Sequence, residues 1–264
     1  MIDFDGAGPW LPQAENTTFY IDGFRSLLDF HLTLTPGLNV LVGPNGSGKT
    51  NFLDFLEFLS QIITAGSAAA VSSAGGISRV FSQENIRRAS PRVRASISGM
   101  AHLKESANIE RQFRYEYDIE LRFSRDTAAL YISRESLKFW KAHSPHEPYM
   151  GTTSVGAVSV TRRSPAEDIA PTWKVGPRLY ADNPRNPMNI MPAYYNTRSA
   201  PMMMDRLQGA YIGPDESILS SRLPIPAVDA VRRALMRGRS FNILPERARQ
   251  PDDVSKPPAI AKDG

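Results

Sequence analysis

Apolar and polar residues alternate with a period of two at both ends of the segment 17–34. Asp22 and Gly23 lie between the two alternating runs, and this pair is typical of a bend that joins two antiparallel strands. Residues 38–42, L-N-V-L-V, form a short β-branched and apolar run that favours a further strand. We therefore expect three short strands at the start of the fold.

Helical spacing then replaces the alternation. The apolar side chains of residues 52–63 recur every three or four positions, which predicts a helix that ends near Gly66. Residues 67–76 are rich in Ala, Ser and Gly, so we expect a mobile low-complexity linker there. A short helix is expected at residues 78–88.

A second, strand-rich region begins at residue 93. Residues 114–123, R-Y-E-Y-D-I-E-L-R-F, alternate along their whole length, and residues 129–140 follow as their expected antiparallel partner. Asp118 and Glu120 share one face of the first of these strands, so we expect both to face solvent and assign them no catalytic pairing.

The remainder of the chain carries weaker patterns. Residues 141–206 predict long loops, with a weak strand at 156–160, and residues 225–236 have the spacing of a helix. The chain is thus divided into residues 1–66 (strands, loop and helix), 67–92 (linker and basic segment), 93–244 (antiparallel strands and a helix) and 245–264 (a Pro-rich, irregular tail).

The loop between the third strand and the first helix has a chemical signature. Residues 43–50, G-P-N-G-S-G-K-T, fit the phosphate-binding (Walker A) pattern G-x-x-x-x-G-K-[ST]. Its glycines permit backbone N–H groups to converge on a phosphate, and the following helix N-terminus adds partial positive charge. The Lys49 ammonium suits the β- and γ-phosphates, and the Thr50 hydroxyl suits Mg²⁺. We therefore expect ATP or GTP to bind here.

The amino-acid composition excludes several kinds of site and several classes of protein. The absence of cysteine excludes disulfides, thiolate metal sites and a cysteine nucleophile, and His31, His102, His143 and His146 are too scattered for a zinc site. No secretory signal and no long apolar run are evident, so a cytoplasmic protein without a membrane role is expected.

The formal charge is +4, and five arginines fall within sixteen residues. A solvated surface and a contact with nucleic-acid phosphates both remain open for this cluster. Its members are Arg79, Arg87, Arg88, Arg92 and Arg94.

Residues 18–60 resemble a known family. The strand pair that carries G-F-R-S and the loop G-P-N-G-S-G-K-T-N are similar to the N-terminal lobe of ABC-type ATPases of the SMC/RecF/OLD-like group, in which Asn45 and Asn51 extend the general loop pattern. A second likeness, to predicted AAA-type ATPases related to OLD proteins, covers residues 112–137. The resemblance implies an α/β P-loop NTPase fold, with a loop strand, its helix and an antiparallel β subdomain.

The resemblance also implies site residues. Mg-ATP would bind at Gly43, Pro44, Asn45, Gly46, Ser47, Gly48, Lys49, Thr50 and Asn51, with Mg²⁺ on Thr50. Arg25 would contact a phosphate or the ribose, although a solvated arginine is an equal alternative. Gln208 is the candidate for the glutamine that senses Mg²⁺ and the attacking water, with Glu216 as a competitor.

The resemblance further implies that hydrolysis needs a second lobe. A signature serine loop, an apolar strand ending in Asp-Glu and a switch histidine are not found in this sequence. Three explanations stay open: a piece of a longer ATPase, half of a split ATPase, or a degenerate binder. In relatives, ATP joins two heads, so we expect a homodimer or a partner chain with the second lobe, coupled to DNA repair, DNA maintenance or phage defence. The alternative is a non-hydrolysing module that docks a partner ATPase or nuclease. A small-molecule kinase is disfavoured by the flanking strands.

Overall fold

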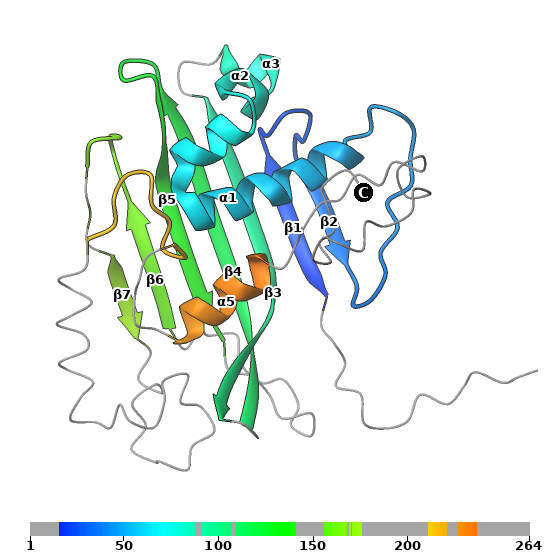
Figure 1. The fold of residues 1–264 in the computed structure, drawn as a ribbon, viewed down its shortest axis with the longest axis vertical. Helices are drawn as coiled ribbons and strands as arrows, with labels where there is room; N and C mark the ends of the chain where they lie inside the picture. Colours follow the sequence, from blue (N-terminus) through cyan, green and yellow to red (C-terminus); the bar gives the residue numbers. More distant parts are fainter. Residues whose placement is uncertain are drawn as a thin grey trace, which may run out of the picture.

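A computed structural model describes eight stretches of the chain: residues 16–87, 91–106, 109–140, 156–167, 169, 171–175, 211–220 and 226–236. Figure 1 shows one layer of strands with helices packed on it. The elements are β1 (Thr17–Asp22), β2 (Phe30–Leu34), α1 (Lys49–Ser73), α2 (Ile77–Val80), α3 (Gln83–Ile86), β3 (Arg92–Ser106), β4 (Ile109–Ser124), β5 (Ala129–Phe139), β6 (Gly156–Thr161), β7 (Thr172–Val175) and α5 (Pro226–Met236).

The described strands form a single sheet of seven with the order β2-β1-β3-β4-β5-β6-β7. Every neighbouring pair is antiparallel. The predicted β1–β2 and β4–β5 pairings are confirmed, because Phe19 lies opposite Leu32 and Tyr117 lies opposite Leu137. The fold is therefore α/β with an antiparallel sheet.

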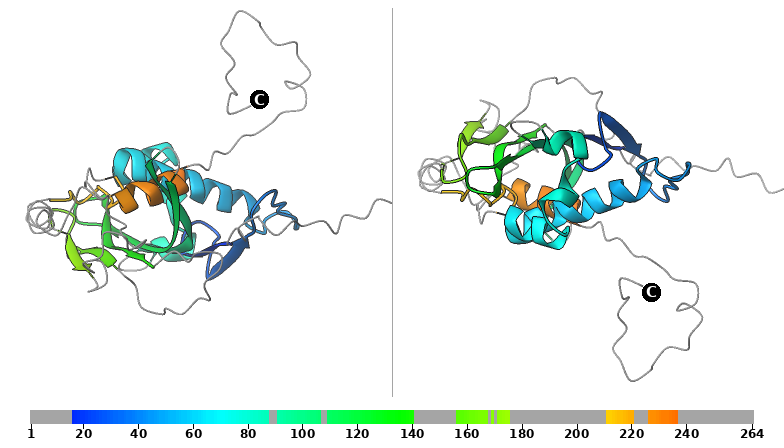
Figure 2. Two further views of the ribbon diagram at one scale, coloured as in Figure 1. Left: turned by 90° about the horizontal axis from the view of Figure 1, so that it is seen from below. Right: turned by 90° about the horizontal axis from the view of Figure 1, so that it is seen from above.

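The two faces of the sheet differ in polarity, as the period-two alternation requires. Val93, Ala95 and Ile97 of β3 are buried on the face that carries α1 and α5, whereas the residues between them are only half-buried. Figure 2 shows α1 and α5 on the same side of the sheet. Among the described elements, no long helix covers the opposite face, which we call the outer face.

Helix α1 packs its apolar stripe on the sheet, as its spacing predicted. Phe52, Phe55, Ile62 and Ile63 are each at most 2% exposed. At Gly66 the backbone leaves helical angles, with φ of +87°, and the chain then resumes a helix through Ser73. The predicted helix end at Gly66 is thus a kink.

The expectation of a mobile linker at residues 67–76 was wrong for residues 67–73. Ser67 is fully buried, and its backbone N–H donates to the carbonyl of Asp215 at 2.9 Å. Its hydroxyl donates to the carbonyl of Leu130 on β5 at 3.2 Å. These tertiary contacts hold a segment whose small side chains carry little periodic signal. The single helix expected at 78–88 is in fact the two short helices α2 and α3.

Residues 211–220 are tied to the sheet by a buried polar network. The Glu135 carboxylate on β5 accepts hydrogen bonds from the Tyr117 hydroxyl at 2.6 Å and the Ile218 backbone N–H at 2.7 Å, and also from the Ser217 hydroxyl. Burial raises the pKa of Glu135, while these three donors favour its charged form. Arg162 donates to the carbonyls of residues 132, 212 and 213 and completes the attachment.

The predicted strand at residues 38–42 is absent. This segment is irregular, and the side chains of Leu38, Val40 and Val42 are 91%, 70% and 88% exposed. An apolar strand needs a neighbouring strand for its backbone groups and a surface for its side chains. The described residues supply neither at this position.

Helix α1 also bears on the membrane question. It is long and apolar enough, by length and composition, to be a candidate membrane span among the described residues. The expectation that no segment meets this test was therefore wrong. A core helix meets the same criteria, and nine residues of α1 are buried in this fold.

The kink in α1 leads to a stability prediction. An alanine Cβ at Gly66 would lie 3.1 Å from the Asp215 carbonyl oxygen and would adopt a positive φ. We expect Gly66→Ala to lower the free energy of unfolding by roughly 2–3 kcal/mol, measured by urea denaturation.

Gly37→Ala is the matched control. Gly37 has a φ of +91°, but no atom lies within 4 Å of the position that an alanine Cβ would take there. This variant therefore reports the backbone strain alone, about 1 kcal/mol. Equal losses in the two variants would contradict a role for the Asp215 contact.

Candidate functional site

The loop of residues 43–50 folds around the Lys49 side chain. The ammonium donates to the carbonyl oxygens of Gly43 and Pro44, both at 2.7 Å, and contacts the Ser47 hydroxyl at 3.2 Å. A turn is closed by the Ser47 N–H, which donates to the Pro44 carbonyl at 3.3 Å. The loop is thus curled around a cation.

Two glycines of the loop adopt conformations that other residues rarely take. Gly46 has a φ of +84° and Gly48 a φ of +90°. At Gly48 a Cβ would also lie 3.0 Å from Leu27 of the bend after β1. The loop therefore needs glycine for its backbone angles and, at Gly48, for close packing against that bend.

Helix α1 begins inside the loop, at Lys49. Gly48 provides no side-chain cap, and the first turn contains no acidic residue. The first N–H groups of a helix have no partner within the helix and favour an anion. Together with the ammonium, they make this loop a place where a phosphate group fits chemically.

The loop is accessible to solvent. Residues 43–47 and Thr50 are exposed, and Lys49 is half-buried. Asn45 and Gly46 lie in the turn. Residues 43–50 are therefore neither an extended segment nor packed under other elements.

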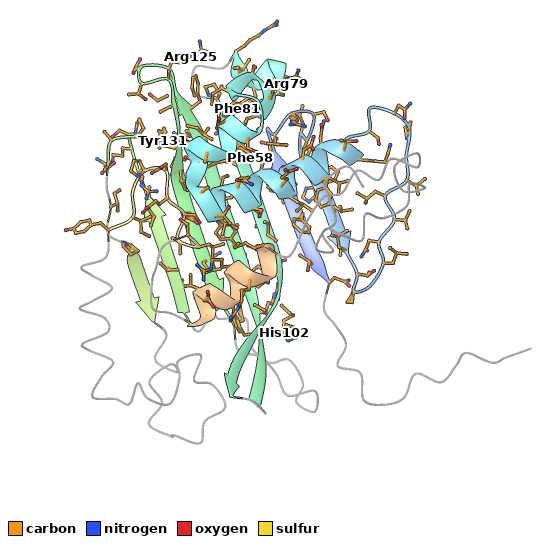
Figure 3. The ribbon with its side chains drawn as sticks, in the orientation of Figure 1. Phe58, Arg79, Phe81, His102, Arg125 and Tyr131 are labelled. Carbon is orange, nitrogen blue, oxygen red and sulfur yellow. The ribbon has the colours of Figure 1, made fainter. Side chains whose placement is uncertain are left out.

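A cavity of about 540 Å³ lies beside the start of α1. Ser26 connects the cavity to the loop. Its hydroxyl accepts a hydrogen bond from the Asn51 side chain at 2.6 Å, and it lies 3.6 Å from the position that a Cβ on Gly48 would take. Arg79 and Phe81, labelled in Figure 3, border the cavity near α2. The full lining is Arg25, Ser26, Asn51, Ala74, Ser78, Arg79, Phe81 and Ser82.

Arg25 is held at the edge of this cavity. Its guanidinium forms an ion pair with Asp54 of α1 and donates from Nε to the Arg79 carbonyl at 2.8 Å. Its side chain is 26% exposed and its φ is +47°. Arg25 is thus fixed close to the loop, whereas a freely solvated arginine was the alternative considered from sequence.

The bend that carries Arg25 is itself fixed by Asn85 of α3. The Asn85 side chain donates to the carbonyls of Gly23 and Arg92 at 3.0 Å and 2.5 Å, and accepts from the Arg92 N–H at 3.2 Å. A Cβ on Gly23 would lie 2.4 Å from the Arg92 carbonyl oxygen, so only glycine fits there. Asp54, Asn85 and Ser26 were missed from sequence, since nothing in their spacing marks them as partners of the loop.

The remaining candidates do not join this site. Glu216 is exposed and lies next to Asp215, which contacts the kink at Gly66. That kink is about 25 Å along α1 from Lys49 at 1.5 Å per residue, so Glu216 is wrong as a residue of the loop site. Gln208, Arg88, His143 and His146 lie outside the described residues. No group of His, Asp or Glu among the described residues could hold a metal ion by itself.

The comparisons with known proteins agree with this geometry. Residues 38–152 match the family described as "AAA domain, putative AbiEii toxin, Type IV TA system". The match therefore includes the loop, α1 and the strands β3 to β5.

The chain is also similar to proteins called DNA replication and repair protein RecF. The relative from Beutenbergia cavernae is 33% identical over 104 residues, which cover 33% of this chain and 26% of the relative. The relative from Erwinia tasmaniensis is 47% identical over 45 residues (17% of this chain, 12% of the relative), and that from Pseudarthrobacter chlorophenolicus is 39% identical over 66 residues (25% and 15%).

The chain spans about a quarter or less of the length of these relatives. The family match is not confined to the loop pattern, because it continues through α1 and the strands β3 to β5. Residues 38–152 are thus similar to a family of AAA domains, and shorter stretches of this chain are similar to RecF.

Proposed function

We propose that this chain is the ATP-binding head lobe of an SMC/RecF/OLD-like ATPase, with a P-loop NTPase fold. Mg-ATP binds at residues 43–51, and binding brings two heads together. The observation that carries the proposal is the Lys49 ammonium, which lies inside a curled loop at an uncapped helix N-terminus.

The ammonium of Lys49 is well placed to exchange its present partners for phosphate oxygens. It now donates to two loop carbonyls and contacts a hydroxyl, all in residues 43–47. A phosphate oxygen carries more negative charge than a carbonyl oxygen and makes a stronger hydrogen bond with an ammonium. Gly43 to Asn51 thus form the proposed phosphate site, with Pro44, Asn45, Gly46, Ser47 and Gly48 as its backbone.

Thr50 is the proposed Mg²⁺ ligand. Its side chain is exposed on the first turn of α1, so its hydroxyl would be available as a ligand to a Mg²⁺ ion that arrives with the nucleotide. A single hydroxyl does not bind Mg²⁺ alone, since this ion keeps several waters and phosphate oxygens in its shell. The metal is therefore expected only together with the nucleotide.

The cavity beside α1 is the proposed place of the nucleoside. It adjoins the loop through Ser26 and Asn51 and offers hydroxyl groups and two guanidinium groups. Arg25, oriented by Asp54, would donate to the ribose or a phosphate. Gln208 remains the proposed sensor of the attacking water, at a position outside the described residues.

Hydrolysis is proposed to need a second lobe. Among the described residues, no group of His, Asp or Glu could hold a metal ion by itself, and phosphoryl transfer requires a group that positions water and a filled metal shell. The exposed apolar segment 38–42 supports such a lobe, because it is a strand sequence without a neighbour. In this scheme the second lobe supplies that neighbour, either on the same polypeptide or on a partner chain.

The names of the relatives support a proposal for the biological role. RecF is named for DNA replication and repair, and the AAA family description names a toxin of a toxin–antitoxin system. We propose a cytoplasmic role in DNA maintenance, repair or phage defence, with DNA as a partner and a homodimer or a second chain completing the ATPase.

A non-hydrolysing interaction module is the second candidate. The same exposed segment 38–42 favours it, since a surface of three apolar side chains suits docking of a partner ATPase or nuclease chain. In that case nucleotide binding would control docking alone.

Lys49→Ala tests the central assignment. Removal of the ammonium leaves the phosphate charge without its closest cation, so we expect ATP affinity to fall at least about 100-fold, or about 2.7 kcal/mol, measured by isothermal titration calorimetry with Mg²⁺. Lys138→Ala, a lysine of β5 that is ion-paired with Glu116, is the control and should bind ATP as wild type does. Tight ATP binding by Lys49→Ala would remove the proposed function.

Arg25 is tested by comparison with its ion-pair partner. We expect Arg25→Ala to weaken ATP binding by roughly 5- to 20-fold through loss of one charged hydrogen bond, and Asp54→Asn, which keeps the arginine, to weaken it by less than about 3-fold. A partly exposed ion pair contributes at most about 1 kcal/mol to stability, so both variants should stay folded in thermal melts. Equal ATP affinities of Arg25→Ala and wild type would mean that Arg25 serves the fold alone.

Phosphate release separates the two candidate functions. The isolated chain is expected to show only background hydrolysis of ATP. Coexpression with the coding sequence that lies next to it on the genome should raise the rate at least about 10-fold if a second lobe completes the site. Background rates in every such combination, despite ATP binding, would favour the interaction module.

A further inference from the structure

The outer face of the sheet carries four arginines at the end nearest α3. Arg92 and Arg94 lie on β3, Arg122 on β4 and Arg134 on β5, and we call them the outer-face arginine cluster. They share one face because the pairing places Arg92 opposite Arg122, and Glu120 opposite both Arg94 and Arg134. This cluster is separate from the loop site, which lies at the start of α1.

Arg92 and Arg122 form an unusual cross-strand pair. Like charges directly opposite each other on neighbouring strands repel and destabilise the sheet. Arg122 has a counter-charge, since its Nε donates to Glu120 at 2.7 Å. The side chain of Arg92 makes no hydrogen bond or ion pair with another described residue, and the same is true of the exposed Arg134.

Glu120 lies beneath two of these arginines and holds both by hydrogen bonds. Its carboxylate is 7% exposed and accepts from Arg94 Nε at 2.8 Å on one oxygen, and from Arg122 Nε and the Ser133 hydroxyl on the other. Burial alone would raise the pKa of Glu120, but these hydrogen bonds outweigh it and lower the pKa to about 2. The expectation that Glu120 is a solvent-facing carboxylate was therefore wrong, because two arginines cover it.

This arrangement leaves donors pointing outward. Arg94 and Arg122 each use only Nε toward Glu120, which leaves their terminal Nη groups for other partners. The two side chains are 42% and 36% exposed. Beside them is a hollow of about 350 Å³ that Arg94, Glu120 and Arg134 line together with hydroxyl-bearing residues, namely Tyr20, Ser96, Ser136, Ser159 and Thr161.

We propose that the outer-face arginine cluster binds the phosphate backbone of duplex DNA, with Glu120 as the residue that positions Arg94 and Arg122. This proposal rests on the proposed function for its biological setting, but its chemistry is independent of the loop. Guanidinium groups match phosphate oxygens in geometry, and hydroxyl groups are common additional donors to phosphates.

The excess of positive charge on this part of the outer face favours a ligand with several phosphates over a single phosphate ion. On this end of the face, four guanidinium groups stand against two carboxylates, those of Glu120 and of Asp22, which lies opposite Arg94. Asp118 also lines the hollow, and it shares Lys138, which is 3.8 Å away, with the closer carboxylate of Glu116. Two rows of arginines on neighbouring strands, about 5 Å apart, can contact successive phosphates of one strand, whereas one free phosphate would engage only part of the cluster.

The test is the affinity of the full chain for a fluorescein-labelled 20-base-pair duplex, measured by anisotropy at several salt concentrations without nucleotide. The double variant Arg92→Ala/Arg134→Ala removes the two guanidinium groups that have no described partner. We expect its Kd to rise roughly 10-fold at 0.1 M salt and the slope of log Kd against log salt to decrease by about 2.

Arg233→Ala is the control on the opposite, helix-bearing face of the sheet. Arg233 lies on α5, its side chain is 54% exposed, and it is ion-paired with Asp229 at 3.2 Å. The control should change Kd by less than about 2-fold. Wild-type affinity of the double variant, or an equal loss in the control, would overturn the proposal.

Two further measurements complete the test. The first asks whether another anion occupies the cluster, and the second asks whether DNA binding and ATP binding are independent. Displacement of the duplex by inorganic phosphate or by poly-glutamate of equal charge, at constant ionic strength, would show a site for another anion and overturn the DNA assignment. ATP affinity of the double variant should equal that of wild type, and Lys49→Ala should keep its DNA affinity. A chain that does not bind ATP at the loop could therefore still bind DNA through the cluster, and a chain that does not bind DNA could still bind ATP.

Discussion

The aromatic packing between α1 and the first strands fixes the position of everything near the loop. The Phe52 ring packs edge-on against Phe19 of β1 at 5.3 Å and also contacts Phe30 of β2, while Phe24 of the bend contacts Phe55 and Phe58. Aromatic pairs of this kind contribute beyond the area that they bury. Because Phe52 lies three residues after Lys49, this packing determines where the helix starts and where its ammonium lies. The site is thus held by a rigid element, although its own loop is exposed.

The second half of α1 is fixed by different forces. Beyond the kink at Gly66, backbone and hydroxyl groups of Ser67 bond to residues 130 and 215, and the buried Glu135 network holds the segment 211–220 in place. Removing one partner from such a network leaves a buried polar group unsatisfied. Apolar packing therefore sets the loop end of α1, and polar attachment sets the distal end.

The pattern of apolar and polar residues correctly predicted the elements that pack against neighbours close to them in the sequence. The alternation of β4 and β5 and the spacing of α1 were enough, because each buries one face on a neighbour close in the chain. The segment 38–42 shows the limit of this reasoning. Its sequence favours a strand, but a strand exists only with a partner, and the described residues leave it exposed.

The residues of the candidate site also fall into those that the sequence reveals and those that it does not. The residues from Gly43 to Thr50 could be found because the phosphate-binding pattern is contiguous. Asp54 and Asn85 could not, since their partners Arg25 and Gly23 are distant in sequence and only the folded bend brings them together. Glu120 was misassigned because alternation reveals which face a side chain occupies, but not which neighbours cover it.

The bare apolar segment before the loop has a consequence for the life of this polypeptide in the cell. Leu38, Val40 and Val42 lie at the surface, and among the described strands β2 is at the edge of the sheet, with β1 as its one neighbour. Unpaired edges and exposed apolar strands are templates for aggregation and are recognised by chaperones and proteases. If a second lobe or partner chain covers this segment, as proposed, the stability and the abundance of this polypeptide would follow the supply of that partner.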